Sequence, residues 1–193
     1  YNIIIGGILL TKLIYIIGLP GTGKSTIMKE FMASRDWSAE RVTDLLDTHV
    51  SGNVRVLGKY SDEETFSGTD RLSMAVAPKA TEWMNTAPDE VIIGEGDRLN
   101  NKAFFEAAKS VGELHIIHIA SSDDERERRY DLRGSNQSDK FISTVRTKVS
   151  NIAEHFGDKT TLFGTEEGNV TEFIHEVPQH TTEIVEHIES LIS

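Results

Sequence analysis

The chain has 193 residues, of which 38% are hydrophobic and 26% are charged, an ordinary composition for a globular protein of one domain. It contains no cysteine, which excludes disulfides, thiolate zinc sites and cysteine nucleophiles, and we expect no structural metal. The formal net charge of −11 argues against a protein that coats nucleic acid through a general positive field.

The positive charge is concentrated in one segment. Between residues 126 and 148 there are seven Lys or Arg and three Asp or Glu, a local excess of four positive charges. This pattern predicts that a polyanion is contacted at one place only. A solvated charged helix is the alternative interpretation.

The first nineteen residues are very apolar, but they match neither a secretory signal nor a membrane helix. They have no basic start and no small-residue cleavage site, and Lys12 interrupts the run short of the roughly 20 apolar residues that a membrane span needs. We therefore expect no membrane association. We expect residues 1–11 to be an extension of unclear role and residues 12–193 to form a single domain.

Short strands rich in β-branched residues alternate with longer helical patterns, which predicts an α/β fold with a parallel sheet flanked by helices. The strands are expected at residues 13–17, 53–57, 91–93, 114–120 and 170–175. The helices are expected at residues 24–34, 78–85, 101–111, 139–156 and 181–192. The helix at 139–156 has an apolar face formed by Phe141, Val145, Val149 and Ile152.

The first predicted strand leads into a glycine-rich segment, the phosphate loop (residues 18–25), which matches the pattern G-x-x-x-x-G-K-[ST] in full. In this motif the glycines turn backbone N–H groups toward phosphates, and the N-terminus of the following helix adds partial positive charge. We expect Lys24 to reach the β- and γ-phosphates of ATP and the Ser25 hydroxyl to bind Mg²⁺. The expected ATP-binding residues are Gly18, Leu19, Pro20, Gly21, Thr22, Gly23, Lys24, Ser25 and Thr26.

Other classes of phosphate-loop protein fit the sequence less well. A GTPase would have an Asn/Thr-Lys-x-Asp motif, and neither Lys148 nor Lys159 is followed by the required aspartate. A motor-type ATPase would usually be larger or have an obvious region for coupling to a partner. The short chain therefore favours a P-loop nucleotide-kinase fold acting on a small acceptor.

Residues 58–73 form a polar, glycine-punctuated segment that we interpret as a functional loop. Asp70 and Arg71 are adjacent in it, and a carboxylate beside an arginine suits binding of the acceptor. Tyr60 and Phe66 could stack on a base. A salt-bridged structural turn is the alternative.

The predicted strand at residues 91–93 leads into Glu95, Asp97 and Arg98. Ligands gather at the carboxyl ends of strands in an open parallel sheet, so this turn is placed to act in chemistry. Glu95 and Asp97 could hold Mg²⁺ through water or accept a proton from the acceptor hydroxyl. Either Glu95 or Asp70 is expected to be the general base, with Asp97 nearer to the metal and joining Ser25 as a metal-binding residue. Arg98 would hold a phosphate or a carboxylate. A surface turn with incidental charges is the alternative.

An arginine-rich lid is expected at about residues 121–138. Arg126, Arg129 and Arg133 are spaced three and then four apart, so they share one helical face. Such a face could close over the γ-phosphate, and we expect Arg129 and Arg133 to be catalytic. A solvated helix paired to its own acidic residues is the alternative.

These motifs together resemble the thymidylate kinase-like branch of P-loop kinases, in which an Asp-Arg pair follows a core strand. The strings LGKYS (57–61), FSGTDRLSMAV (66–76), EGDRL (95–99) and RGSNQS (133–138) resemble phage 5-hydroxymethyluracil DNA kinases, and the resemblance covers about residues 12–193. It implies an ATP-dependent enzyme that phosphorylates the hydroxymethyl group of 5-hydroxymethyluracil in DNA, a step in thymidine hypermodification. The modified DNA would be the substrate and partner, and the enzyme would act in the cytoplasm, that of the host if it is phage-encoded.

Two other functions stay open at this point. A kinase for free nucleosides or deoxynucleoside monophosphates has the same core and needs only a pocket. A non-catalytic P-loop ATPase or switch would lack a carboxylate that activates a hydroxyl, and its turnover would not depend on an acceptor.

Overall fold

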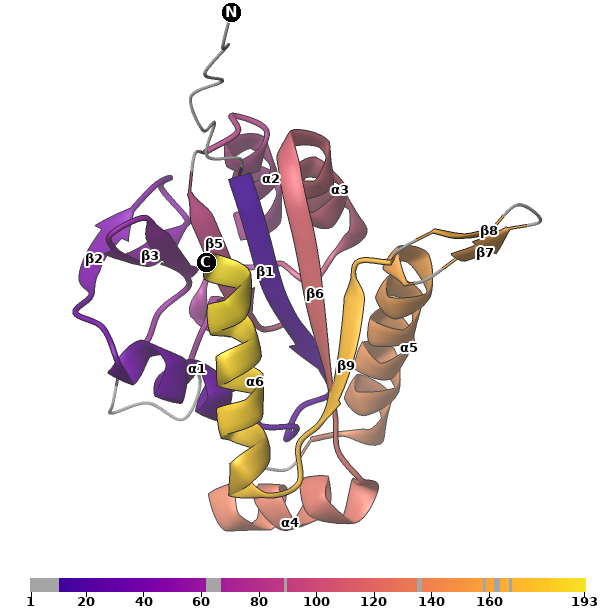
Figure 1. The fold of residues 1–193 in the computed structure, drawn as a ribbon. Helices are drawn as coiled ribbons and strands as arrows, with labels where there is room; N and C mark the ends of the chain where they lie inside the picture. The colour runs from indigo at the N-terminus through magenta and orange to yellow at the C-terminus, as the bar shows by residue number, and fades with distance from the viewer. Residues whose placement is uncertain are drawn as a thin grey trace, which may run out of the picture.

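A computed structural model describes residues 11–61, 67–88, 90–134, 137–157, 159–161, 164–166 and 168–193. Its centre is a seven-stranded sheet with the strand order β2-β3-β4-β5-β1-β6-β9 (Figure 1). The strands are β1 (Thr11–Gly18), β2 (Ser38–Arg41), β3 (Asp47–Ser51), β4 (Val54–Leu57), β5 (Val91–Glu95), β6 (Gly112–Ala120) and β9 (Val170–Ile174). The five strands β4, β5, β1, β6 and β9 are mutually parallel, whereas β2 and β3 add an antiparallel edge.

Helices cover both faces of the sheet, as Figure 1 shows. The helices are α1 (Lys24–Ala33), α2 (Val76–Met84), α3 (Lys102–Val111), α4 (Asp123–Arg133), α5 (Asp139–Phe156) and α6 (Pro178–Ile192). One face of the sheet packs against α1 and α6, and the other against α2, α3 and α5. The remaining helix, α4, lies across the end of the sheet toward which β1 points.

The central strand β1 is buried on both faces, and its alternating side chains divide the core in two. Leu13, Tyr15 and Ile17 belong to the cluster with α2, α3 and α5, whereas Ile14 and Ile16 belong to the cluster with α1 and α6. All five are at most 1% exposed. The strand predicted at residues 13–17 is confirmed, and its lack of a polar face is typical of a strand in the middle of a parallel sheet.

The predicted α/β class, a parallel sheet with helices on both faces, is confirmed. The last helix begins earlier than predicted, at Pro178 rather than near residue 181, because proline is tolerated in the first turn, where its missing N–H is not needed. The antiparallel pair β2–β3 was not predicted. A small hairpin of β7 (Lys159–Thr161) and β8 (Gly164–Glu166) was not predicted either.

Thr11 is the first residue of β1. It is 2% exposed, pairs with Gly112 of β6, and donates a hydrogen bond from its hydroxyl to the Pro88 carbonyl. Residues 1–10 of the expected extension lie outside the described part of the chain. Within the described ranges, no helix combines the length and the apolarity needed to cross a membrane.

Candidate active site

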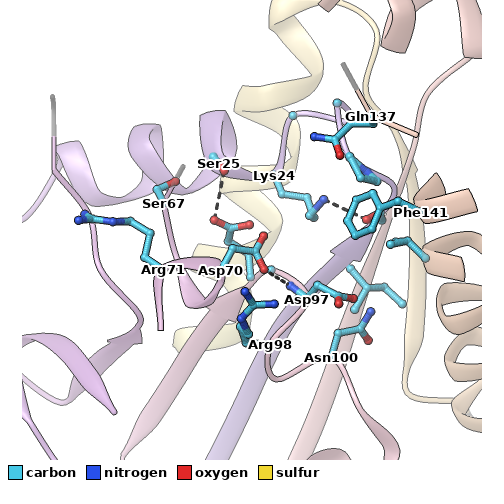
Figure 2. A pocket seen from close by; sticks show the side chains of 18 of the residues that line it. Lys24, Ser25, Ser67, Asp70, Arg71, Asp97, Arg98, Asn100, Gln137 and Phe141 are labelled. Atoms are coloured by element: carbon cyan, nitrogen blue, oxygen red, sulfur yellow. Dashed lines mark hydrogen bonds between the residues drawn. The ribbon is translucent and has the colours of Figure 1, made fainter. Parts of the chain in front are cut away.

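A cavity of about 550 Å³ lies at the carboxyl ends of β1 and β5. Its walls come from the phosphate loop, from the short 3₁₀ helix Thr69–Arg71, from the β5 turn (residues 96–100) and from the first turns of α5. Figure 2 shows side chains from these segments converging on the cavity. Residues 18–25 and residues 67–71, which are about 45 positions apart in the sequence, therefore meet in one site.

The phosphate loop is bent by glycines with positive φ. Gly23 caps α1 with φ of 95°, and a Cβ built at this position would lie 2.3 Å from ring atoms of His175. An alanine at this position would therefore be strained and would also collide with the imidazole. The loop meets the N-terminus of α1, so the partial positive end of the helix faces the cavity.

The ammonium group of Lys24 is held at the phosphate loop. Its Nζ donates hydrogen bonds to the carbonyls of Gly18 at 2.9 Å and Leu19 at 3.0 Å. Carbonyl contacts of this kind are modest and exchangeable. A phosphate entering the loop would offer a stronger, charged acceptor to the same ammonium group.

Glu95, the last residue of β5, is 1% exposed and lies beside the phosphate loop. Its Oε1 accepts a hydrogen bond of 3.2 Å from the Ser25 hydroxyl. Burial raises the pKa of Glu95 to about 7, and the Lys24 ammonium group opposes this rise while the Asp70 carboxylate adds to it. A cation bound at this carboxyl would favour its charged form, because an opposite charge nearby lowers the pKa of an acid.

A hydroxyl and a carboxylate 3.2 Å apart are hard oxygen donors, and this donor set fits Mg²⁺. Within the described ranges, no three His, Cys, Asp or Glu residues form a cluster able to hold a metal ion. A Mg²⁺ at Ser25 and Glu95 would therefore take its other ligands from nucleotide phosphates and water. Of the two carboxylates expected near the metal, Glu95 rather than Asp97 therefore lies beside Ser25.

Asp97 is engaged on the other side of the β5 turn. Its carboxylate Oδ1 accepts from the Lys148 Nζ of α5 at 2.9 Å, and its carbonyl accepts from the same Nζ at 2.8 Å. The Asp97 N–H donates to Asp70 Oδ1 at 2.6 Å, a contact drawn in Figure 2. Asp70 and Asp97 both line the cavity, and Asp70 is fixed by the backbone of the β5 turn.

Helix α4, in the segment where a lid was expected, contacts the phosphate loop. Arg129 donates from Nη1 to the Gly21 carbonyl and from Nη2 to the His175 carbonyl, both at 2.9 Å, and from Nε to Glu125 at 2.7 Å. Tyr130 donates its hydroxyl to the Pro20 carbonyl at 2.6 Å. Arg129 thus joins α4, the phosphate loop and the end of β9.

The arginines of α4 do not share one cavity-facing surface as expected. Arg126 is 5% exposed and paired to Asp123, and neither Arg126 nor Arg129 lines the cavity. These two arginines pair with acidic residues of their own helix, Asp123 and Glu125, which is the arrangement of the alternative interpretation. Arg133 lies in α4, and its side chain is outside the described part of the structure.

The predicted acceptor residues divide into two groups. Arg71 and Arg98 line the cavity, where Arg71 contacts the Ser61 hydroxyl at 3.3 Å and Arg98 contacts the Leu72 carbonyl at 3.4 Å. Tyr60 packs against the core with its ring centroid 5.9 Å from that of His49, and it is not part of the cavity wall. Phe66 lies outside the described residues.

Eight further residues of the cavity wall were not predicted as site residues: Ile17, Ser67, Gly96, Asn100, Tyr130, Gln137, Phe141 and Val145. Asn100 belongs to no recognised sequence motif. Its position two residues after the Asp97-Arg98 pair could nevertheless have indicated that it lies near the site. Phe141 was predicted on the same apolar face of its helix as Val145, yet it is 42% exposed while Val145 is 5% exposed. The first turn of α5 extends beyond the core, so its apolar face continues into the cavity.

The family comparison covers nearly the whole chain. Residues 9–190 match the model of a family described as P-loop Nucleotide Kinase3. A search of the curated proteins found no match. The strand order, the phosphate loop and the carboxylate at the end of the neighbouring strand agree with this match, and the chain belongs to the P-loop nucleotide kinase family.

Proposed function

We propose that this protein transfers the γ-phosphate of ATP to the hydroxymethyl group of 5-hydroxymethyluracil in DNA. The proposal rests on the positions in the structure of the two segments whose sequences most specifically resemble the DNA kinases. Residues 66–76 and 95–99 are about twenty positions apart in the chain, yet Asp70, Arg71 and Arg98 line the same cavity as Lys24 and Ser25. The segments that resemble the DNA kinases thus form the wall that faces the phosphate loop.

The donor side of the cavity suits a nucleoside triphosphate with Mg²⁺. The loop amides and the N-terminus of α1 would surround the phosphates, and Lys24 would exchange the Gly18 and Leu19 carbonyls for phosphate oxygens. Ser25 and Glu95 would hold Mg²⁺, which neutralises phosphate charge when bound. Glu95 is then a metal-binding residue rather than the general base.

Asp70 is then the carboxylate proposed as general base. It lines the cavity, and its Oδ1 is oriented by the N–H of Asp97, so its second oxygen can accept the proton of the acceptor hydroxyl. The hydroxyl oxygen forms a bond to the γ-phosphorus while the bond from that phosphorus to the β–γ bridging oxygen breaks. ADP leaves, and the hydroxyl proton moves to Asp70.

A kinase acting on a free nucleoside or deoxynucleoside monophosphate is a second candidate. The net charge of −11 and a cavity of about 550 Å³ favour it, because a single nucleotide needs an enclosed pocket and no extended positive surface. In that case Arg71 and Arg98 would hold the monophosphate of the acceptor rather than a phosphate of a DNA strand.

The two candidates are separated by their acceptors. The protein is incubated with γ-labelled ATP and with three acceptors: DNA containing 5-hydroxymethyluracil, the free modified nucleoside and its monophosphate. The proposal expects label in the polymer, and DNA with thymine in place of the modified base is the control. Label in the free monomers with none in the polymer would establish the second candidate instead.

A further inference from the structure

Two buried polar atoms in the cavity wall have no hydrogen-bond partner among the described residues: Oδ1 of Asn100 and Oγ of Ser67. The two residues are 2% and 4% exposed. Buried amide and hydroxyl groups in folded proteins nearly always have partners, because an unpaired one is costly. An unpaired acceptor in the wall of a cavity therefore indicates a ligand that donates a hydrogen to it.

Asn100 is held firmly by the residues on either side of it. Leu99 is fully buried in the core, and the Asn101 side chain caps α3 by accepting from the Phe104 N–H at 3.0 Å. Both neighbours are fixed, so the backbone at Asn100 is positioned before any ligand arrives, and the residue itself is 2% exposed. Preorganised groups of this kind give specificity, because little ordering is required on binding.

An aromatic ring lies in the same cavity wall. Phe141, Val145 and Lys148 are four and then three residues apart on α5, so they share one face of the helix. Lys148 attaches this face to the β5 turn through Asp97, and Phe141 is the large apolar residue of α5 that stays exposed. Figure 2 shows Phe141 on the Asn100 side of the cavity, away from Ser67 and Arg71. A half-exposed ring in such a place can stack on a flat base.

We propose that Asn100 and Phe141 form the recognition site for the acceptor base. Asn100 Oδ1 accepts a hydrogen bond from the N3–H of a uracil-type base, and Phe141 stacks on the face of that base. The choice of a uracil-type base rests on the proposed function. The N3–H group is used in Watson–Crick pairing, so the site takes a base that is out of the duplex, whether flipped, single-stranded or free.

The test is a binding measurement with a base whose N3–H is removed. Two single-stranded oligonucleotides are compared, one with 5-hydroxymethyluracil and one with the same base methylated at N3. The two corresponding nucleoside monophosphates are compared as well. The wild-type protein should bind each unmethylated ligand about tenfold more tightly, as expected for one base-edge contact. Asn100→Ala should bind both members of each pair with the same weak affinity.

The neighbouring amide provides the matched control. Asn101→Ser keeps an oxygen that can cap α3 and lies outside the cavity wall, so it should discriminate as the wild type does. Equal wild-type affinity for the two members of each pair, no binding of any of them, or discrimination retained by Asn100→Ala would overturn the proposal. Binding is measured without ATP, so absence of phosphate transfer would refute the proposed function while leaving this result readable.

The aromatic part of the site has its own variants. Phe141→Ala should weaken binding of the methylated and unmethylated ligands alike, by about tenfold, because stacking does not depend on the base edge. Phe141→Tyr should restore the affinity. Thermal unfolding of all variants distinguishes lost recognition from lost folding. Unchanged binding by Phe141→Ala would remove the ring from the site.

Discussion

The Ser25 hydroxyl donates a hydrogen bond of 3.2 Å to Glu95 Oε1, joining the first turn of α1 to the end of β5. Glu95 pairs in register with Ile16 of β1, so the sheet itself sets the position of the carboxylate beside the phosphate loop. This contact lies at the end of the cavity where the phosphate donor, ATP, is proposed to bind.

Replacing Lys24 with alanine should abolish phosphate transfer, with a loss of at least about 10²-fold. The side chain belongs to neither core cluster, so the melting temperature should change little. Turnover and thermal unfolding are measured together. Lys29→Ala, at an exposed position of the same helix, is the matched control and should behave as wild type. Wild-type turnover by Lys24→Ala would contradict the kinase assignment.

Asp70→Asn should lower turnover by about 10²- to 10⁴-fold, because the amide keeps the shape of the side chain but cannot accept the hydroxyl proton. The change is measured as kcat with saturating ATP and acceptor. Asp36→Asn, at an exposed position far along the chain, is the control. A loss of less than about tenfold would mean that the proton goes elsewhere, and Glu95→Gln would be tested next.

Arg129→Ala should reduce turnover more than it weakens nucleotide binding. Arg129 holds the Gly21 carbonyl in place, and a small displacement of reacting groups costs up to about 10²-fold in rate. Its partner on the helix, Arg128, is 60% exposed and shares Glu125 with it, so Arg128→Ala is the matched control. The kcat and the dissociation constant for ATP are both measured. An equal loss of nucleotide affinity with unchanged kcat would make Arg129 a binding residue only.

Stability should depend on pH through Glu95. Its pKa is about 7 in the folded protein and 4.5 when exposed, so unfolding releases a proton between these values. The free energy of unfolding should therefore fall as the pH rises from 4.5 to 7, by about 3 kcal/mol from this group, and then level off.

The substitution Glu95→Gln should remove this pH-dependent component. Denaturant unfolding of the metal-free protein at several pH values, with wild type and variant side by side, isolates it from the other titrating groups. Glu82→Gln, at an exposed position of α2, is the control. A pH profile of Glu95→Gln that runs parallel to that of the wild type would contradict the raised pKa.

Much of the fold follows from local patterns in the sequence. The phosphate loop, its strand and its helix are encoded within residues 11–33, and the apolar run at residues 91–93 predicts strand β5. The edge strands β2 and β3 were missed because they are short. The residues of β2 are all exposed and include charged side chains, so they have no alternating apolar pattern to detect.

The candidate site is harder to obtain from sequence, because it depends on which segments meet. The pairing of Asp97 with Lys148 joins positions 51 residues apart and moves this carboxylate toward α5. Spacing alone suggested that the arginines of α4 face a phosphate, but local ion pairs hold Arg126 against Asp123. Phe141 looked like a core residue because helical periodicity cannot tell where the core ends.

Product analysis tests the central claim most directly. DNA containing 5-hydroxymethyluracil is incubated with γ-labelled ATP, Mg²⁺ and the protein, digested to nucleosides, and examined by mass spectrometry. We expect the label in 5-phosphomethyl-deoxyuridine with wild-type protein, and none with Lys24→Ala or with DNA containing thymine. Label confined to strand termini, or to free nucleotides added in competition, would contradict the account.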